Sequence, residues 1–107
     1  MAYDRGLANR VADALARLGE RGARQKNVFG GRGFLLGKRT FVIVWGEGLL
    51  VKVPAGEYPA LVRMAGVSPF EPGGERAMGT WVVVEAGLVA EDPELAEWIA
   101  RGLAGIR

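Results

Sequence analysis

The first apolar pattern in the chain has the period of a helix. Its positions are spaced by four, four and three residues, and they are Leu7, Val11, Leu15 and Leu18. Such spacing places them on one face of a helix. Asp4 stands where its carboxylate would cap the start, and Gly19 and Gly22 would end the helix.

From residue 25 to 53 the apolar residues form short segments separated by glycine, which is typical of strands. The segments are NVFGGRGFLL, RTFVIVW and GLLVKV. Short loops at 37–39 and 46–48 predict hairpins, so we expect a three-stranded meander. In its middle strand Phe41, Ile43 and Trp45 should point to one face, and the two valines between them to the other. Both faces are apolar, so both should be covered.

The next stripe has helical spacing over residues 58–65, and Gly66 closes it. An irregular segment follows, and its Pro72-Gly73-Gly74 is typical of a type II turn, with Pro at the second and Gly at the third position. We expect this turn to be the tip of a second hairpin. Its return strand should span 80–85, TWVVVE.

The last stripe predicts a C-terminal helix. Asp92 is expected to be its N-cap, with Pro93 at the first helical position. The buried stripe should comprise Leu95, Trp98, Ile99, Leu103 and Ile106. Gly102 and Gly105 are expected to weaken the end of the helix, because glycine is a poor helix former.

These elements predict one α+β domain over residues 1–107, in the order α-β(3)-α-β(2)-α. Its five strands should form one antiparallel sheet packed against three helices. The core should contain Leu7, Val11, Leu15, Leu61, Val62, Trp98, Ile99 and Leu103. Three helices cover one sheet face more readily than two, so we expect a second copy to cover the other face in a homodimer.

The composition narrows the class of protein. Half of the residues are hydrophobic and 24% are charged, as in folded globular domains. No apolar run is long enough to span a bilayer, and the N-terminus lacks the apolar core of a signal peptide, so we expect a cytoplasmic protein. Without His or Cys the chain cannot form a serine triad, a cysteine–histidine dyad or an ordinary zinc site. We expect no catalysis, no cofactor and no metal.

The stretch VFGGRGFLLGKRT, residues 28–40, first suggests a phosphate-binding loop. A Walker A motif needs glycine five positions before the Gly37-Lys38 pair and a hydroxyl residue after it, but Arg32 and Arg39 stand there. Such a loop must also open a helix, whereas the next residues, TFVIVW, are β-formers. The stretch is better explained as a bent strand whose glycines permit a bulge or close packing.

Charge is unevenly distributed along the chain. The net charge is +2, but residues 1–40 carry nine basic and three acidic groups, against five and nine in residues 41–107. Six basic residues could form a rim that contacts phosphate or a partner, and they are Arg21, Arg24, Lys26, Arg32, Lys38 and Arg39. No helix-turn-helix, zinc-finger or RNA-recognition signature accompanies them. Nucleic-acid binding should therefore be weak and indifferent to sequence, and a solvated charged surface is the alternative.

Four stretches in order resemble the N-terminal domain of the TfoX/Sxy family, and they are YDRGLANRVADAL, VFGGRGF, EYPALV and AMGTWVVV. That domain typically has a Tyr-Asp-x-Gly-Leu helix, a Met-Phe-Gly-Gly strand, a Tyr-x-x-Leu helix and a Gly-x-Trp strand. Val28 stands where methionine is usual. The resemblance implies an α-β(3)-α-β(2)-α fold similar to that of secretion chaperones.

The resemblance also implies a function. Family members include regulators of competence genes that act in transcription, and their partner would be RNA polymerase or a DNA-binding regulator. Two-domain members carry a further helical domain, and we expect this chain to act as a stand-alone N-terminal domain. The leading hypothesis is a non-enzymatic interaction domain in transcriptional regulation. The alternative is a small chaperone-like or ligand-binding module with no nucleic-acid role.

Substitution of Trp98 by Ala tests the predicted core. If Trp98 is buried against the sheet, its truncation should lower the free energy of unfolding by about 3 to 5 kcal/mol. Chemical denaturation followed by circular dichroism measures this change. A denaturation midpoint equal to that of the unchanged protein would show that Trp98 lies outside the core.

Overall fold

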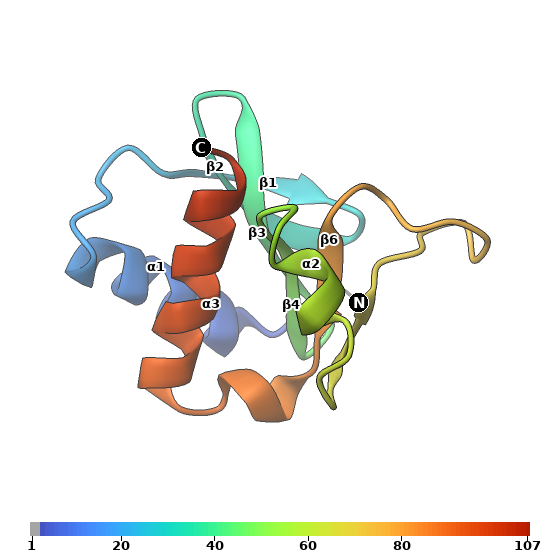
Figure 1. The fold of residues 1–107 in the computed structure, drawn as a ribbon. Coiled ribbons are helices and arrows are strands. Elements are labelled where there is room, and N and C mark those ends of the chain that lie inside the picture. The colour runs from blue at the N-terminus through green and yellow to red at the C-terminus, as the bar shows by residue number, and fades with distance from the viewer. Residues whose placement is uncertain (1–2) are drawn as a thin grey trace.

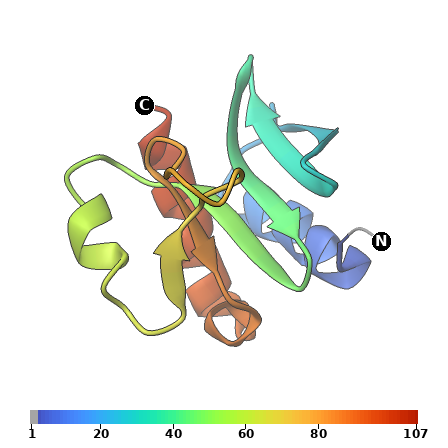
Figure 2. The same cartoon turned by 90° about the vertical axis from the view of Figure 1, so that its right-hand side faces the viewer.

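The computed structural model describes residues 3–107 as one open antiparallel sheet with two long helices, α1 and α3, on one face (Figure 1). A loop over residues 70–80 crosses the other face (Figure 2). The helical elements are α1 (Arg5–Arg17), α2 (Tyr58–Leu61), the 3-10 helix η1 (Ala86–Val89) and α3 (Asp92–Gly105). The strands are β1 (Arg24–Val28), β2 (Gly31–Leu36), β3 (Arg39–Trp45), β4 (Gly48–Lys52), β5 (Val67–Pro69) and β6 (Trp81–Val84).

The sheet has six strands rather than the five expected, in the order β1-β2-β3-β4-β6-β5. All neighbouring strands are antiparallel. The first four follow the order of the chain, and β6 then lies between β4 and β5. The three α-helices and the antiparallel sheet agree with the prediction. The element order is corrected to α-β(4)-α-β(2)-α, with η1 before the last helix.

The additional strand comes from the glycine-rich stretch, which folds as a hairpin rather than as one bent strand. Val28 pairs with Gly31, and Phe29 and Gly30 between them have φ values of 53° and 77°. Two positive φ values are those of a type I′ turn, which joins antiparallel strands tightly. Gly31 must be glycine, because a Cβ atom there would collide with the carbonyl oxygen of Val44. The turn escapes prediction because its usual Asn-Gly pair is here Phe-Gly.

Aromatic contacts hold this unusual turn. The indole N–H of Trp45 donates to the carbonyl oxygen of Phe29 at 3.2 Å. The rings of Phe29 and Trp45 both lie edge-on to Phe70, with centroids 5.4 and 5.5 Å away. A bulky side chain is rare at positive φ, so these contacts offset an unfavourable backbone conformation.

Both ends of α1 are capped as the sequence predicts. The Asp4 carboxylate accepts a hydrogen bond from the Leu7 N–H at 3.0 Å. At the other end Gly19 has a φ of 81°, and the Glu20 N–H donates to the Leu15 carbonyl oxygen at 2.9 Å. This is the Schellman arrangement, in which a left-handed glycine reverses the chain.

The second hairpin also forms as predicted, with β5 paired to β6. Its tip differs in detail. The Gly74 N–H donates to the Glu71 carbonyl oxygen at 2.9 Å, which closes a turn over residues 71–74. The positive φ, 79°, belongs to Gly74 and not to Gly73, so the turn is type I rather than the expected type II.

The larger core cluster lies between the helices and the sheet. The predicted core residues that are buried are Leu7, Val11, Leu15, Leu61, Trp98, Ile99 and Leu103. Val62 is only half-buried, because α2 is a single turn rather than a helix over 58–65. Phe41 also belongs to this cluster instead of facing the same way as Ile43. A register shift between β2 and β3 leaves Phe41 without a partner, so both it and Val42 reach the helix side.

The opposite face carries a smaller core cluster. Ile43 and Leu50 are buried there with Phe70 and Trp81, which come from the 70–80 loop and β6. The chain itself therefore covers the part of this face that was expected to need a second copy (Figure 2). The reasoning behind the homodimer does not hold, and self-association stays a prediction.

The N-terminal end of α3 is joined to α1 by an ion pair. Asp92 is the first residue of the helix and Glu91 is its N-cap, which corrects the expected cap by one residue. One carboxylate oxygen of Asp92 accepts hydrogen bonds from Nη2 and Nε of Arg10 at 2.9 and 3.1 Å. The Asp92 carboxylate thus bridges two helices instead of capping one.

Two glycines bring α3 close to the sheet. At Gly102 a Cβ atom would lie 2.7 Å from the carbonyl oxygen of Phe41, and at Gly105 it would collide with the backbone of Lys52. The two positions, three residues apart, share one face of the helix. Both were expected only to weaken the helix. They instead let α3 lie directly on the backbones of β3 and β4.

Substitution of Gly102 by Ala tests this close approach. Alanine favours a helix by about 1 kcal/mol over glycine, yet we expect a net loss of about 1 to 3 kcal/mol from overpacking against Phe41. Gly87→Ala in η1 is the control, because its added Cβ would meet nothing within 4 Å. Chemical denaturation measures both variants. A Gly102→Ala protein as stable as the control would contradict the proposed contact.

Candidate functional site

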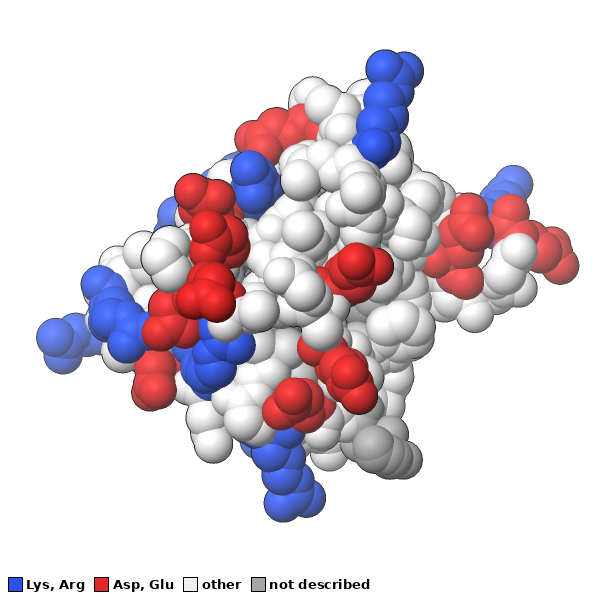
Figure 3. Space-filling model, turned by 90° about the horizontal axis from the view of Figure 1, so that it is seen from below, with Lys and Arg blue, Asp and Glu red and all other residues white. Residues whose placement is uncertain are grey.

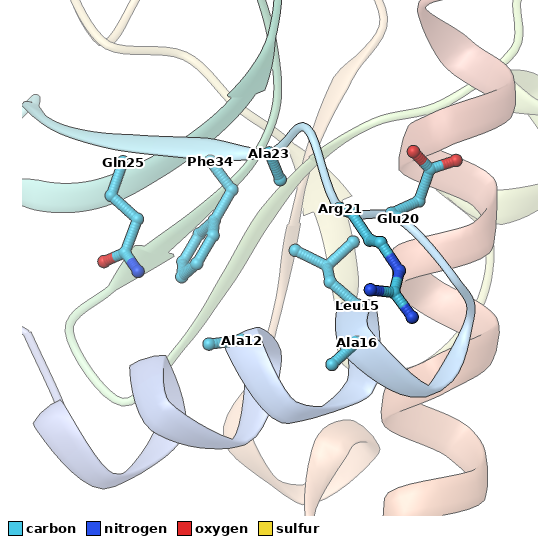
Figure 4. A pocket seen from close by; sticks show the side chains of 8 residues that line it. All are labelled: Ala12, Leu15, Ala16, Glu20, Arg21, Ala23, Gln25 and Phe34. Carbon is cyan, nitrogen blue, oxygen red and sulfur yellow. The ribbon is translucent and has the colours of Figure 1, made fainter.

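A hollow of about 460 Å³ lies between α1 and the first hairpin (Figure 4). Its lining residues are Ala12, Leu15, Ala16, Glu20, Arg21, Ala23, Gln25 and Phe34. Apolar side chains from α1 and β2 form its floor, and Glu20, Arg21 and Gln25 supply polar groups around it (Figure 4). A hollow that combines apolar side chains with a few polar groups is the usual form of a binding site.

A second hollow, of about 280 Å³, continues along the same helix. It is lined by Tyr3, Arg5, Ala8, Asn9, Gln25 and Arg32. Gln25 lines both hollows, so they are adjacent, and we name the two together, between α1 and the edge strand β1, the α1–β1 groove. Ala8, Ala12 and Ala16 recur every fourth residue along its helical wall. Because their side chains are small, the helix projects little into the groove at three successive turns.

The charge of the groove is positive. Arg5, Arg21 and Arg32 line it, and Glu20 is the one acid among the lining residues of the described chain. The Glu20 carboxylate is already paired with Arg107, at 2.8 Å. Three arginines thus line the α1–β1 groove, and the single carboxylate among its described lining residues has a basic partner.

The Arg32 side chain is held in a fixed orientation by two side chains of β1. Its Nε donates to Gln25 Oε1 at 2.9 Å, and its Nη1 donates to Asn27 Oδ1 at 3.1 Å. Gln25 and Asn27 lie on the same face of the sheet as Arg32, since Asn27 is paired with Arg32 and strand side chains alternate. The guanidinium retains unbonded N–H groups that an anionic ligand could use.

The six basic residues singled out in the sequence do not share one surface. Arg21 and Arg32 line the groove. Arg24 and Lys26 alternate with Gln25 along β1 and so point to the opposite face of the sheet.

The remaining two basic residues lie at the β2–β3 turn, away from the groove. Lys38 is exposed in that turn, and the Arg39 guanidinium donates to the carbonyl oxygen of Ile106 beyond α3. Arg24 also donates to a carbonyl oxygen in this turn, that of Gly37, at 2.9 Å. A single phosphate-contacting rim of six residues is therefore not formed.

Acidic side chains gather elsewhere. Figure 3 looks from the side on which η1 and the start of α3 lie, and it shows acidic groups across this face with basic groups mainly toward the edges.

The described residues offer little for other chemistry. Within 3–107, no group of three or more His, Cys, Asp or Glu side chains could hold a metal ion. No helix in this range is long and apolar enough to cross a membrane.

Sequence reasoning found the groove only in part. Arg21 and Arg32 were singled out for their charge, whereas the alanine row and Gln25 were missed. The row could have been noticed, because Ala8, Ala12 and Ala16 run beside the apolar stripe at the same helical spacing. Its position against β1 depends on tertiary structure that no local pattern shows.

Comparison with known families decides the classification. Residues 13–106 match the TfoX N-terminal domain. The chain belongs to this family. The TfoX N-terminal domain is associated in general with the regulation of competence and DNA uptake. Comparisons with curated proteins and with solved structures found no match, so the expected likeness to secretion chaperones stays a prediction.

The dispersed basic residues give a prediction for DNA binding by this TfoX N-terminal domain. We expect a dissociation constant no tighter than about 10⁻⁴ to 10⁻⁶ M near physiological salt, equal for unrelated duplexes and weakening steeply with salt. Fluorescence anisotropy on two duplexes across a salt series measures this. Lys38→Ala should weaken binding only slightly, because it removes one phosphate contact. Strong discrimination between the duplexes would reveal a recognition element in the chain.

Proposed function

We propose that this TfoX N-terminal domain is a non-enzymatic interaction domain that acts in transcriptional regulation through protein–protein contacts. The observation that carries the proposal is the α1–β1 groove, which combines an apolar floor with the guanidinium groups of Arg5, Arg21 and Arg32. Arginine and apolar contacts are typical of protein interfaces. The proposed role requires a cytoplasmic location, with RNA polymerase or a DNA-binding regulator as the partner class.

The distribution of charge favours a protein partner over direct reading of DNA. The outward face of α1 is mixed, with Arg10 and Arg17 beside Asp13. Arg10 is also paired with Asp92, which offsets part of its charge toward a phosphate. A recognition helix needs side chains that are free to reach base edges in the major groove.

The alternative, a ligand-binding or chaperone-like module, draws support from the same site. A hollow of about 460 Å³ is within the size range of small-molecule pockets. Its continuation into the second hollow, toward Arg5, favours an elongated occupant instead.

Site-specific crosslinking tests the proposal in native cells. A photoreactive amino acid replaces Ala16 in the groove or, as a matched control, Ala104 on the exposed side of α3. We expect a subunit of RNA polymerase or a DNA-binding regulator to be crosslinked at position 16 and not at position 104. Recovery of one client unrelated to transcription at position 16 would support the alternative. Equal crosslinking at both positions would contradict a groove-directed contact.

A further inference from the structure

We propose that the α1–β1 groove binds an extended acidic segment of a partner protein, which adds to the free edge of β1 as a seventh strand. This inference rests on the proposed function, because it names the kind of partner segment that an interaction domain with this groove would take. Its support comes from the edge of β1, from the charge of the groove, and from the poorer fit of the other two occupants, a second copy of the chain and a nucleic acid.

The edge of β1 is the first support. Among residues 3–107, β1 is the first strand of the sheet and pairs only with β2. Within this part of the chain, alternate N–H and C=O groups on its outer edge therefore lack a strand partner and are available to an added strand. The strand RQKNV contains no proline, which would interrupt such pairing.

The charge of both faces is the second support. An added strand would point alternate side chains toward the groove and toward the opposite face of the sheet. On the groove side they would approach Arg21 and Arg32, and on the opposite side Arg24 and Lys26. Carboxylates on either face of the added strand thus meet a basic side chain. The orientation of Arg32 is already fixed by Gln25 and Asn27, so little side-chain freedom is lost on binding.

A second copy of the chain is a poor occupant of this edge. Pairing β1 with another β1 would bring Arg24 and Lys26 of both copies together on one face, and β1 has no acidic residue to compensate. Like charges opposite one another destabilise a strand pair. The same basic groups that repel a second copy attract an acidic segment.

A nucleic acid fits the groove less well than a peptide. The free strand edge presents both donors and acceptors, whereas a phosphodiester backbone offers acceptors alone. The floor of alanine, leucine and phenylalanine side chains also provides no partner for phosphate oxygens.

Nuclear magnetic resonance with model peptides tests the inference. The probe is a capped heptapeptide, Ser-Glu-Val-Glu-Val-Glu-Ser, added in large excess to the ¹⁵N-labelled protein. We expect perturbed amide resonances in β1 (Arg24–Val28) and along Ala8, Ala12 and Ala16. The same peptide with Gln in place of Glu should bind about tenfold more weakly, because it lacks the charge complementarity. N-methylation of alternate peptide bonds, which removes strand donors, should also weaken binding.

A matched pair of variants locates the site. Ala16→Glu adds a carboxylate to the groove and should weaken binding of the acidic peptide by about tenfold, while Ala104→Glu on α3 should leave it unchanged. Both positions are exposed on helices, so both variants are expected to fold. No perturbation by the peptide, equal perturbation by the Gln peptide, or equal effects of the two variants would overturn the inference. Stronger perturbation of β1 by single-stranded DNA would overturn it in favour of a nucleic acid.

The two proposals can fail separately. If the peptide does not bind but crosslinking at position 16 still captures a transcription protein, the interaction function stands and the strand-addition mode is wrong. If the peptide binds but no transcription protein is captured, the groove takes acidic segments and the proposed role in transcription is wrong.

Discussion

The contact of α3 with the sheet backbone is the constraint on which the rest of the fold depends. Because Gly102 and Gly105 present no side chain to β3 and β4, the helix axis approaches the strands, and Trp98 and Ile99, one turn earlier on the helix, are buried in the core. In this position α3 packs beside α1, and the Arg10–Asp92 ion pair joins the two helices. The α1–β1 groove is what remains open when α1 is held against α3 rather than against the first hairpin.

Much of the fold could be predicted from local patterns, because its long elements have strong periodicity and recognisable ends. Asp4 and Gly19 at α1 and the pairing of β5 with β6 are cases in which local chemistry and tertiary structure agree. The first hairpin could not be predicted, since Phe29 occupies a left-handed position that is stabilised by its contacts with Trp45 and Phe70. Those contacts join residues far apart in the sequence.

The site was less predictable than the fold for a related reason. Charge along the chain shows which residues are basic but not which face of a strand each one occupies. Arg24 and Gln25 are neighbours in the sequence, but their side chains lie on opposite faces of the sheet. The turn at 29–30 determines which residues of β2 pair with them. Without the hairpin, Arg24, Lys26 and Arg32 read as one basic segment. With it, they divide between two surfaces.

The arrangement of α1 and α3 side by side has a consequence for synthesis of the protein. The strands β1 to β4 are neighbours in both sequence and space, so they can pair as soon as they emerge from the ribosome. The apolar face of α1 and the inner face of the meander, however, are completed by α3, which follows all six strands in the chain. The nascent chain therefore carries an uncovered apolar surface until α3 has left the ribosome. That surface is buried, and the groove takes its shape, only after α3 has emerged from the ribosome.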